Sequence, residues 1–394
     1  MHTARERVRV GQRLISKAAL VRLAALLHHE AAPRMPRFFN FFDRWLLLAL
    51  AYFVEQRVQA VVLETGIGGR HDGTRHVPLV PRACIVSSIS FDHIRVLCNI
   101  PDTQTTVSYD DQTLREIARN KAGIIRQRVP VFTSALQRPA ALDVLREEAT
   151  QLEAPLVIVE PDAPSSSQRS LQNDFTQGEN SALVRQCVAL LLAQPPLQGR
   201  VELSRALSGI EHTYWPCRYE RLTLHNGLQV VIDGAHNQDS VDKLFAALTA
   251  DYARRPLWSM FGCTGEHRKE MLASVYLHSH RVALVDGFHA LAVKEQELQE
   301  LIRSIDLEHQ ADAEAKLLAV TPAFGAGIVR VSAIVLEVIA QLEKQAASAS
   351  AGDSLSPVLV VCGSLYLAAA ARLVLHQSHQ HTFALDDWVH QHDL

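Results

Sequence analysis

The chain has 394 residues, which is long for a single compact core and therefore predicts two domains. Its 39 Lys and Arg residues nearly balance its 42 Asp and Glu residues, for a net charge of −3, so charge gives no reason to expect a nucleic acid or an anionic membrane as a partner. The six cysteines are scattered without C-x-x-C spacing, which indicates neither a zinc site nor a disulfide framework, and we expect reduced thiols. The apolar run 45–54 is too short to span a membrane and predicts a buried helix.

Short β-branched runs alternate with longer amphipathic stretches, which is typical of βαβ units around a parallel sheet. Apolar residues at helical spacing predict helices over 181–193 and 240–250, with Ser240 as the N-cap of the second. The helix-breaking segment 194–199 and the residues up to Trp215 predict a boundary between domains of residues 1–212 and 213–394, and the Ala- and Ser-rich residues 346–357 predict a mobile loop. The predicted strands are 58–63, 83–88, 129–133, 156–159, 229–233, 257–261, 281–285 and 358–362.

The most informative segment is Ala60–Thr74, in which an apolar strand runs into Glu64 and then into a glycine-rich turn. In an open parallel sheet, ligands collect beyond the carboxyl ends of the strands, where the Glu64 carboxylate would lie. Gly66, Gly68 and Gly69 would let the backbone turn sharply and approach a phosphate or a metal ion closely. A tight turn between a strand and a helix, without any ligand, explains the same residues.

Three other places carry side chains suited to catalysis, each with a structural alternative. Asp92 and His93 follow a predicted strand, where a lone histidine is most often a satisfied core residue. Lys121 lies in a polar helical stretch and could be a surface lysine. Asp233 follows another strand and precedes Gly234, a pair that usually marks a turn. From the residues alone these alternatives remain open.

Taken together, these segments resemble, in order, the motifs of the folylpolyglutamate synthases, a branch of the ATP-dependent Mur ligase superfamily. The resemblance spans nearly the whole chain. The segment that begins at Glu64 is similar to E-V-G-x-G-G-R-x-D-A-T-N, residues 87–93 (SSISFDH) to T-S-I-x-x-D-H, 117–124 (IARNKAGI) to I-A-x-E-K-A-G-I, 215–218 (WPCR) to W-P-G-R, 233–237 (DGAHN) to D-G-A-H-N, and 358–364 (VLVVCGS) to the final strand and G-S turn.

The resemblance implies a fold and a metal site. The fold is an α/β protein with an N-terminal ATPase-like domain built on a mostly parallel sheet, incomplete here, and a smaller C-terminal Rossmann-like domain. The implied cofactors are ATP and two Mg²⁺ ions, held by Glu64, by His93 with Asp92 as its orienting partner, and by a carbamylated Lys121. Magnesium prefers oxygen ligands and substrate phosphates, which suits this set. Carbamylation needs a neutral amine, which partial burial of a lysine can supply.

The resemblance also implies catalytic and nucleotide-binding residues. Lys121, Asp233 and His236 are the implied catalytic residues, the last two on a loop that meets the nucleotide and the incoming glutamate. Arg218 would bind nucleotide phosphates through its planar fork of donors. Asn180 resembles the nucleotide-contacting asparagine of the family's H-Q-x-x-N segment, although Thr176 replaces its histidine.

One departure from the family pattern concerns the phosphate loop. The family's G-T-N-G-K-G-S loop cradles the phosphates, but no Gly-Lys pair occurs in this sequence, and residues 1–10 resemble the segment after the loop. Two explanations stay open: a true start upstream of Met1, or a truncated, non-catalytic paralogue that could still bind folate or a nucleotide. Cys217 replaces a glycine, Arg75 an asparagine, and 98–113 is an insertion.

The implied reaction is the ATP-dependent addition of L-glutamate, in γ-linkage, to a reduced folate that carries one or more glutamates, through an acyl phosphate. Dihydrofolate synthase activity stays an alternative. Residues 35–42, rich in aromatics, could contact the folate or belong to a helix core. We expect a monomer in the cytoplasm or also in mitochondria. A dehydrogenase is disfavoured because His71 stands where G-x-G-x-x-G needs its third glycine, and the histidines between 376 and 392 predict an exposed tail.

Overall fold

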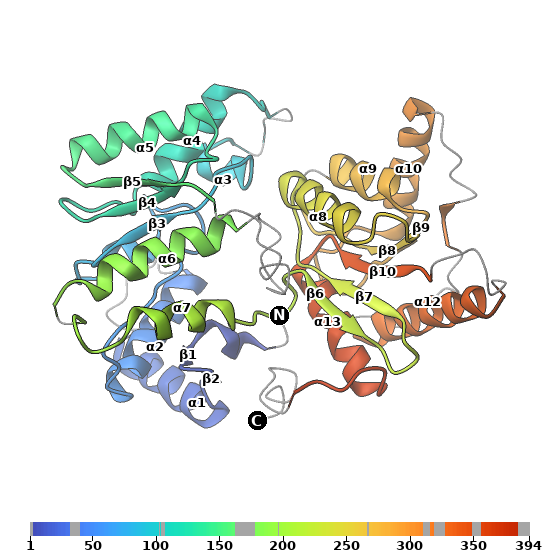
Figure 1. The fold of residues 1–394 in the computed structure, drawn as a ribbon, viewed down its shortest axis with the longest axis horizontal. Coiled ribbons are helices and arrows are strands. Elements are labelled where there is room, and N and C mark those ends of the chain that lie inside the picture. Colours follow the sequence, from blue (N-terminus) through green and yellow to red (C-terminus); the bar gives the residue numbers. More distant parts are fainter. Residues whose placement is uncertain are drawn as a thin grey trace. The chain divides into compact units, whose positions relative to one another are not determined.

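The computed structural model describes residues 3–31, 40–101, 103, 107–161, 178–195, 197–265, 268–309, 316–318, 328–348 and 356–384. The chain divides into two compact units (Figure 1). The N-terminal unit holds residues 5–169 and 176–213, and the C-terminal unit is formed mainly by residues 214–394. None of the described helices is long and apolar enough to cross a membrane.

The N-terminal unit is built around a parallel sheet in which the described strands follow the order β3-β4-β5. Helices α4 and α5 cover one face through a core that includes Ile117 and Val144, and α6 covers the other through Leu183. The strands of this sheet are β3 (Cys84–Val86), β4 (Val131–Ser134) and β5 (Leu156–Val159), and the helices are α3 (Ile94–Leu97), α4 (Asp111–Ala122), α5 (Pro139–Gln151), α6 (Glu179–Leu192) and α7 (Leu203–Glu211).

The N-terminal part of this unit adds a separate small core. Val8, Ile15, Leu23 and Leu48 pack together between a hairpin and two helices. The elements are the 3-10 helices η1 (Ala4–Arg7) and η4 (Gly73–His76), the hairpin strands β1 (Arg9–Val10) and β2 (Arg13–Leu14), the helix α1 (Lys17–Leu26) with its π-helical continuation η2 (Leu27–Ala31), and α2 (Phe41–Glu55). The helix predicted over 45–54 is therefore present, but only Leu48 and Ala49 of α2 are buried.

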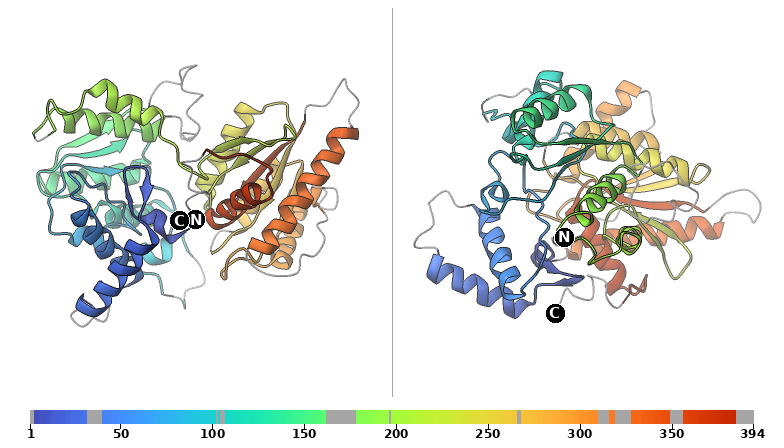
Figure 2. Two further views of the ribbon diagram at one scale, coloured as in Figure 1. Left: turned by 90° about the horizontal axis from the view of Figure 1, so that it is seen from below. Right: turned by 60° about the vertical axis from the view of Figure 1, so that its left-hand side comes forward.

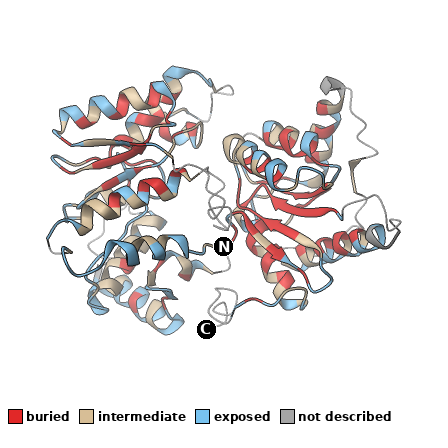
Figure 3. Cartoon of the chain, viewed as in Figure 1, coloured by how far each residue is buried: buried red, intermediate tan, exposed pale blue. Residues whose placement is uncertain are grey.

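The C-terminal unit is a sandwich of helices around a mixed sheet. Its strands lie in the order β6-β7-β10-β8-β9, and only the β6–β7 pair is antiparallel. Alternate strand residues face opposite sides: Val230 and Ile232 pack toward α12 and α13, whereas Val231 packs toward α8, α9 and α10 (Figures 1 and 2). Figure 3 shows that most residues of this sheet are buried. The α/β fold and the Rossmann-like parallel core are as predicted, while β6 was not foreseen.

The strands of this unit are β6 (Glu220–Thr223), β7 (Gln229–Ile232), β8 (Leu257–Phe261), β9 (Arg281–Leu284) and β10 (Val358–Cys362). Its helices are α8 (Gln238–Asp251), α9 (Arg268–His278), α10 (Glu295–His309), α12 (Ile328–Ser348) and α13 (Leu365–Gln377). The loop predicted over 346–357 is wrong at its start, because α12 continues to Ser348; residues 349–355 lie outside the described part of the chain.

One predicted strand is absent. Residues 58–63 form no strand, and Val62 is 95% exposed. In the described chain, none of the backbone groups of residues 59–65 pairs with another backbone group. A strand is stabilised by the ladder it forms with its neighbours and by burial of its side chains, and this segment has neither. The apolar pattern alone was therefore not enough to make it a strand.

Candidate functional site

In the N-terminal unit, the glycine turn after Glu64 packs against the C-terminal end of α4. Gly68 has a left-handed backbone (φ +75°), and a Cβ there would lie 2.7 Å from a methyl group of Leu97. A Cβ on Gly69 would lie 2.5 Å from the carbonyl oxygen of Lys121. Both glycines are therefore needed for this close approach. The turn lies against the end of the helix that carries Lys121.

Asn120 joins three segments of this site. Its side-chain oxygen accepts a hydrogen bond from the Gly69 N–H (3.2 Å), and its side-chain nitrogen donates to the Leu97 carbonyl (3.3 Å). Its own carbonyl accepts from the Arg70 N–H at 2.7 Å. Asn120 thus links the glycine turn and α4 to α3, the short helix that follows His93. Sequence reasoning missed this residue, although it stands beside Lys121.

Asp72 is a second residue that sequence reasoning missed. Its carboxylate is buried and accepts from the N–H groups of Gly66 (2.8 Å) and Thr74 (2.9 Å) and from the Thr74 hydroxyl (2.6 Å). An ionised carboxylate that receives several donors organises a turn firmly. The signal was present in the sequence, as the aspartate of the quoted G-G-R-x-D motif, but it carried no assigned role.

The three predicted metal ligands lie on these joined segments. Glu64 is exposed, and His93 is the left-handed residue (φ 49°) before α3, with its N–H donating to Asp92 Oδ1 at 2.9 Å. Its Nε2 lies 3.9 Å from the same oxygen. Within the described residues, no three His, Cys, Asp or Glu side chains already converge in a way that could hold a metal ion. The structure thus brings the segments together but not a finished set of ligands.

Lys121 occupies the last turn of α4 and is half-buried. Burial lowers the pKa of its ammonium group, and the Asp92 carboxylate partly opposes that effect. Desolvation disfavours the charged form of a lysine, so the neutral amine is easier to reach here than at a surface position. The interpretation of Lys121 as a fully solvated surface lysine is therefore wrong.

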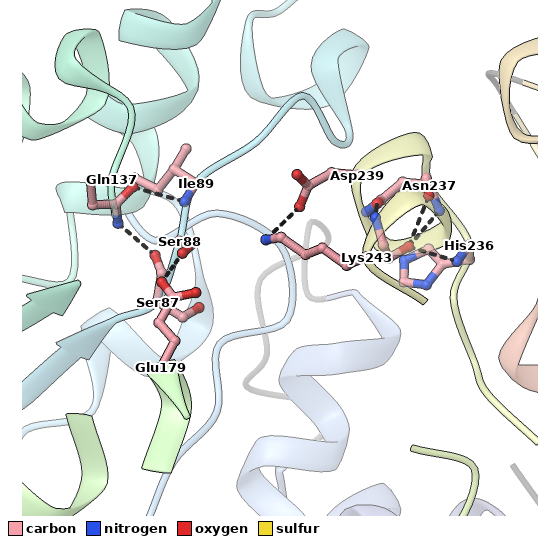
Figure 4. Close-up of polar contacts among 10 residues, drawn as sticks. Ser87, Ser88, Ile89, Gln137, Glu179, His236, Asn237, Asp239 and Lys243 are labelled. Carbon is pink, nitrogen blue, oxygen red and sulfur yellow. Dashed lines mark hydrogen bonds and ion pairs between the residues drawn. The ribbon is translucent and has the colours of Figure 1, made fainter. Parts of the chain in front are cut away.

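A buried polar network lies just beyond β3 and β4 (Figure 4). The Gln137 side chain accepts from the Ile89 N–H (2.9 Å) and donates to the Ser87 carbonyl (2.8 Å), which fixes the loop that leads to Asp92 and His93. The Ser88 hydroxyl donates to Glu179, a buried residue at the start of α6. Asn180, next to Glu179, is exposed, and Gln177 and Thr176 lie outside the described residues.

In the C-terminal unit, Asp233 is completely buried at the end of β7. Its two oxygens accept from the N–H groups of Tyr219 (2.6 Å) and Ala235 (2.7 Å). Burial raises the pKa of Asp233 to about 6, although these two N–H donors and the charges of Arg218 and His236 oppose the rise. The Asp233 carboxylate therefore connects the loop that holds Tyr219 to the loop that holds Ala235. Because Asp233 is buried, its exposed neighbours Arg218 and His236 are the residues that a ligand can reach.

The W-P-C-R segment forms the first of these loops. Cys217 and Tyr219 are buried and have left-handed backbones (φ 60° and 45°), and Arg218 between them is exposed. The Cys217 carbonyl accepts from the Gly234 N–H at 2.9 Å, so the turn is bonded directly to the D-G-A-H-N loop. A left-handed conformation is unfavourable for a non-glycine residue and needs surrounding support.

His236 and Asn237 form the second loop, which Figure 4 shows at the start of α8. The His236 side chain is exposed, and its Nδ1 bonds to the Gly234 carbonyl at 3.0 Å, so the neutral ring carries its proton on Nδ1 and presents Nε2 as an acceptor. Asn237 caps α8 in a capping box with Ser240. The prediction that Ser240 is the N-cap is wrong: it is the third helical residue, and its hydroxyl accepts from the His236 N–H at 3.1 Å.

The histidines near the end of the chain support the packing of this unit. His381 bonds to the Thr223 carbonyl at 2.8 Å, and His376 and His381 pack edge-on against Phe383. We expected these histidines to lie in an exposed tail, but in the described part of the chain His381 is hydrogen-bonded to β6. His390 and His392 lie outside the described residues.

Comparison with known proteins gives a family match and several relatives. Residues 217–365 match the family model of the Mur ligase glutamate ligase domain. Over 240 residues, 56% of the chain, the sequence is 31% identical to a dihydrofolate synthase/folylpolyglutamate synthase of Bacillus subtilis. The chain is thus similar in sequence to folylpolyglutamate synthases and, over residues 217–365, to the glutamate ligase domain of Mur ligases. The match covers 52% of the Bacillus protein, so the chain spans about half of that protein's length.

Solved structures show the same fold at lower identity. The folylpolyglutamate synthase of Thermotoga maritima superposes with a TM-score of 0.66 at 20% identity, covering 98% of this chain and 81% of that one. The bifunctional folylpolyglutamate synthase/dihydrofolate synthase of Yersinia pestis, complexed with AMPPNP and a Mn ion, superposes with a TM-score of 0.69 at 18% identity, covering 95% and 80%. The fold of these solved structures therefore extends over both units of the chain.

Proposed function

We propose that this protein is an ATP-dependent ligase that adds L-glutamate, in γ-linkage, to a reduced folate bearing one or more glutamates. The observation that carries the proposal is the joining of the Glu64 turn, the His93 segment and a half-buried Lys121 through Asn120. The D-G-A-H-N loop, with an exposed His236, supports it from the C-terminal unit. The relatives carry this activity, or this activity with dihydrofolate synthase activity, in their names.

The donor set suits magnesium. Glu64, His93 and a carbamylated Lys121 would hold two Mg²⁺ ions, since carboxylate and carbamate oxygens are hard ligands and an imidazole can complete the set. When bound, the ions would neutralise phosphate charge and orient ATP. The lowered pKa of Lys121 supports the carbamate, because only the neutral amine reacts with carbon dioxide. A related structure contains a Mn ion with a nucleotide analogue.

The other side chains would bind and position the reactants. The exposed Arg218 guanidinium would contact nucleotide phosphates, and the exposed Asn180 the nucleotide. His236 Nε2, held as an acceptor, would receive a proton from the glutamate ammonium group so that the amine can attack the acyl phosphate. Asp233, with both oxygens bonded to backbone N–H groups, would act by fixing these loops. We propose a monomer of the cytoplasm, also present in mitochondria.

The test measures MgATP-dependent incorporation of labelled glutamate into tetrahydrofolate by protein purified from its native source, together with its N-terminal peptide sequence. We expect Glu64→Gln and His93→Ala to lower kcat at least about 100-fold, as loss of a metal-holding group should. Circular dichroism should show that the fold is retained.

Glu153→Gln is the matched control, because it removes an exposed carboxylate of the same unit, paired with Arg128 at 2.8 Å. It should leave kcat unchanged. Full activity in both Glu64→Gln and His93→Ala would refute the metal assignment. Absence of glutamate-dependent ATP turnover in the native protein would refute the ligase and favour a folate- or nucleotide-binding role.

A further inference from the structure

A buried ion pair lies beside the W-P-C-R turn, outside every residue assigned above. The Arg372 side chain, on α13, is fully buried, and its Nε donates to both oxygens of Glu220 at 2.8 and 2.9 Å. Glu220 is the first residue of β6 and is also buried. The Arg372 guanidinium also lies over the Phe383 ring, 4.3 Å from its centroid.

This pair is bonded to two residues of the 214–219 turn, Tyr214 and Cys217. Glu220 Oε2 accepts from the Cys217 N–H at 2.9 Å. The Tyr214 hydroxyl accepts from Arg372 at 2.6 Å and donates to Glu220. Tyr214 is thus bonded to both charged groups, and Cys217, the first residue here with a left-handed backbone, is bonded to Glu220.

The turn is therefore held by two buried carboxylates. Glu220 receives the Cys217 N–H, and Asp233 receives the Tyr219 N–H. Arg218 lies between these two anchored residues and is exposed, although both its neighbours are buried. Because Cys217 and Tyr219 are both left-handed non-glycine residues, the turn would relax if either anchor were lost.

We infer that the Glu220–Arg372 pair, with the Tyr214 hydroxyl, is a positioning device that fixes the 214–219 turn and so directs Arg218 toward an anionic ligand. The nature of that ligand, the phosphates of a nucleotide, rests on the proposed function. The conformation of the turn does not. Arg372, Glu220 and Tyr214 are positioning residues, since they act through Arg218 and are themselves buried or bonded to one another.

The experiment uses the full chain and two mild variants, Arg372→Lys and Tyr214→Phe. Hydrogen exchange with mass spectrometry follows the amides of Cys217 and Tyr219, and calorimetric titration gives the Kd for MgATP. Arg330→Lys is the matched control, because Arg330 pairs with Asp286 and Glu295 in the same unit, away from the turn. Arg218→Gln, alone and combined with Arg372→Lys, tests whether Arg372 acts through Arg218.

We expect both mild variants to speed exchange at these two amides and to weaken MgATP binding about five- to tenfold, with Arg330→Lys changing neither. Arg372→Lys should add no further loss to Arg218→Gln. Unchanged exchange in both variants would overturn the inference, as would additive losses in the double variant. If the unsubstituted protein does not bind MgATP, the proposed function fails, while the exchange rates still decide whether the pair fixes the turn.

Discussion

Gly68 shows how closely the glycine turn approaches the helix that carries Lys121. Alanine at this position would take a left-handed backbone and would also meet the Asn120 side chain and a Leu97 methyl group. We expect Gly68→Ala to destabilise the N-terminal unit by about 2–4 kcal/mol, because backbone strain and overpacking add. The measurement is the free energy of unfolding in urea, with hydrogen exchange used to monitor the N-terminal unit.

Gly11 provides the control for Gly68. It lies in the same unit with a similar backbone (φ +60°), but a Cβ there would meet nothing within 4 Å. Gly11→Ala should therefore cost only the backbone term, about 1–2 kcal/mol. Equal losses in the two variants would show that the contact with α4 does not constrain Gly68.

Asp233 predicts a pH dependence for the C-terminal unit. Burial raises its pKa from an ordinary 3.8 to about 6, so the folded state holds this proton more tightly than the unfolded state. The stability that the group contributes is then present below about pH 4 and is lost as the pH rises to about 6, by up to about 3 kcal/mol. Asp233→Asn abolishes this titration.

The stability advantage of the unsubstituted protein over Asp233→Asn should thus be larger at pH 4 than at pH 7. Urea unfolding of both proteins at pH 4, 5, 6 and 7 gives the difference directly, and other carboxylates largely cancel in the comparison. A constant difference across this range would mean that the pKa of Asp233 is not raised.

At the scale of elements, the strand pattern was predictable where a run of apolar residues also finds partners. Strands β5, β8 and β10 lie at the predicted residues, because each is a short continuous run of mostly apolar residues, as is typical of parallel strands. Residues 58–63 have the same pattern and form no strand, since pairing depends on neighbours that a single run does not reveal. Strand β6 was missed because it begins with two charged residues, Glu220 and Arg221, and charged residues do not indicate a buried strand. Glu220 is buried because it pairs with Arg372, which is far away in the sequence.

The candidate site, like the strands, was predictable from local sequence only in part. Asp233 lies directly after β7, as its spacing predicted, whereas Glu64 follows no strand and Lys121 lies in the last turn of α4. The side chains that hold the motif residues were not predictable: Asn120 and Arg372 act through partners 51 and 152 positions away in the chain. Ser240 was assigned the wrong place in its helix because Asn237, three residues earlier, accepts the hydrogen bond that defines the cap.

At the scale of the whole molecule, each unit has hydrophobic clusters of its own. We expect calorimetry to show two unfolding transitions, with a calorimetric enthalpy well above the van't Hoff value. The C-terminal unit should melt at the higher temperature, because helices bury both faces of its larger sheet, whereas residues 61–63 of the N-terminal unit expose apolar side chains.

Hydrogen exchange between the two transitions should show the N-terminal unit open and the C-terminal unit protected. A single transition whose two enthalpies agree would contradict this expectation. The residues 59–65, without backbone partners in the described chain, should exchange fastest among the apolar segments of the N-terminal unit.

The six free cysteines give this chain a built-in reporter of local opening. Five are buried and Cys98 is half-buried, and they divide evenly: Cys84, Cys98 and Cys187 in the N-terminal unit, and Cys217, Cys263 and Cys362 in the C-terminal unit. Burial raises the pKa of the Cys84 and Cys263 thiols to about 11, so alkylation waits for exposure. Pulsed labelling of the natural sequence, read peptide by peptide, would therefore time the opening of each unit without a single engineered probe.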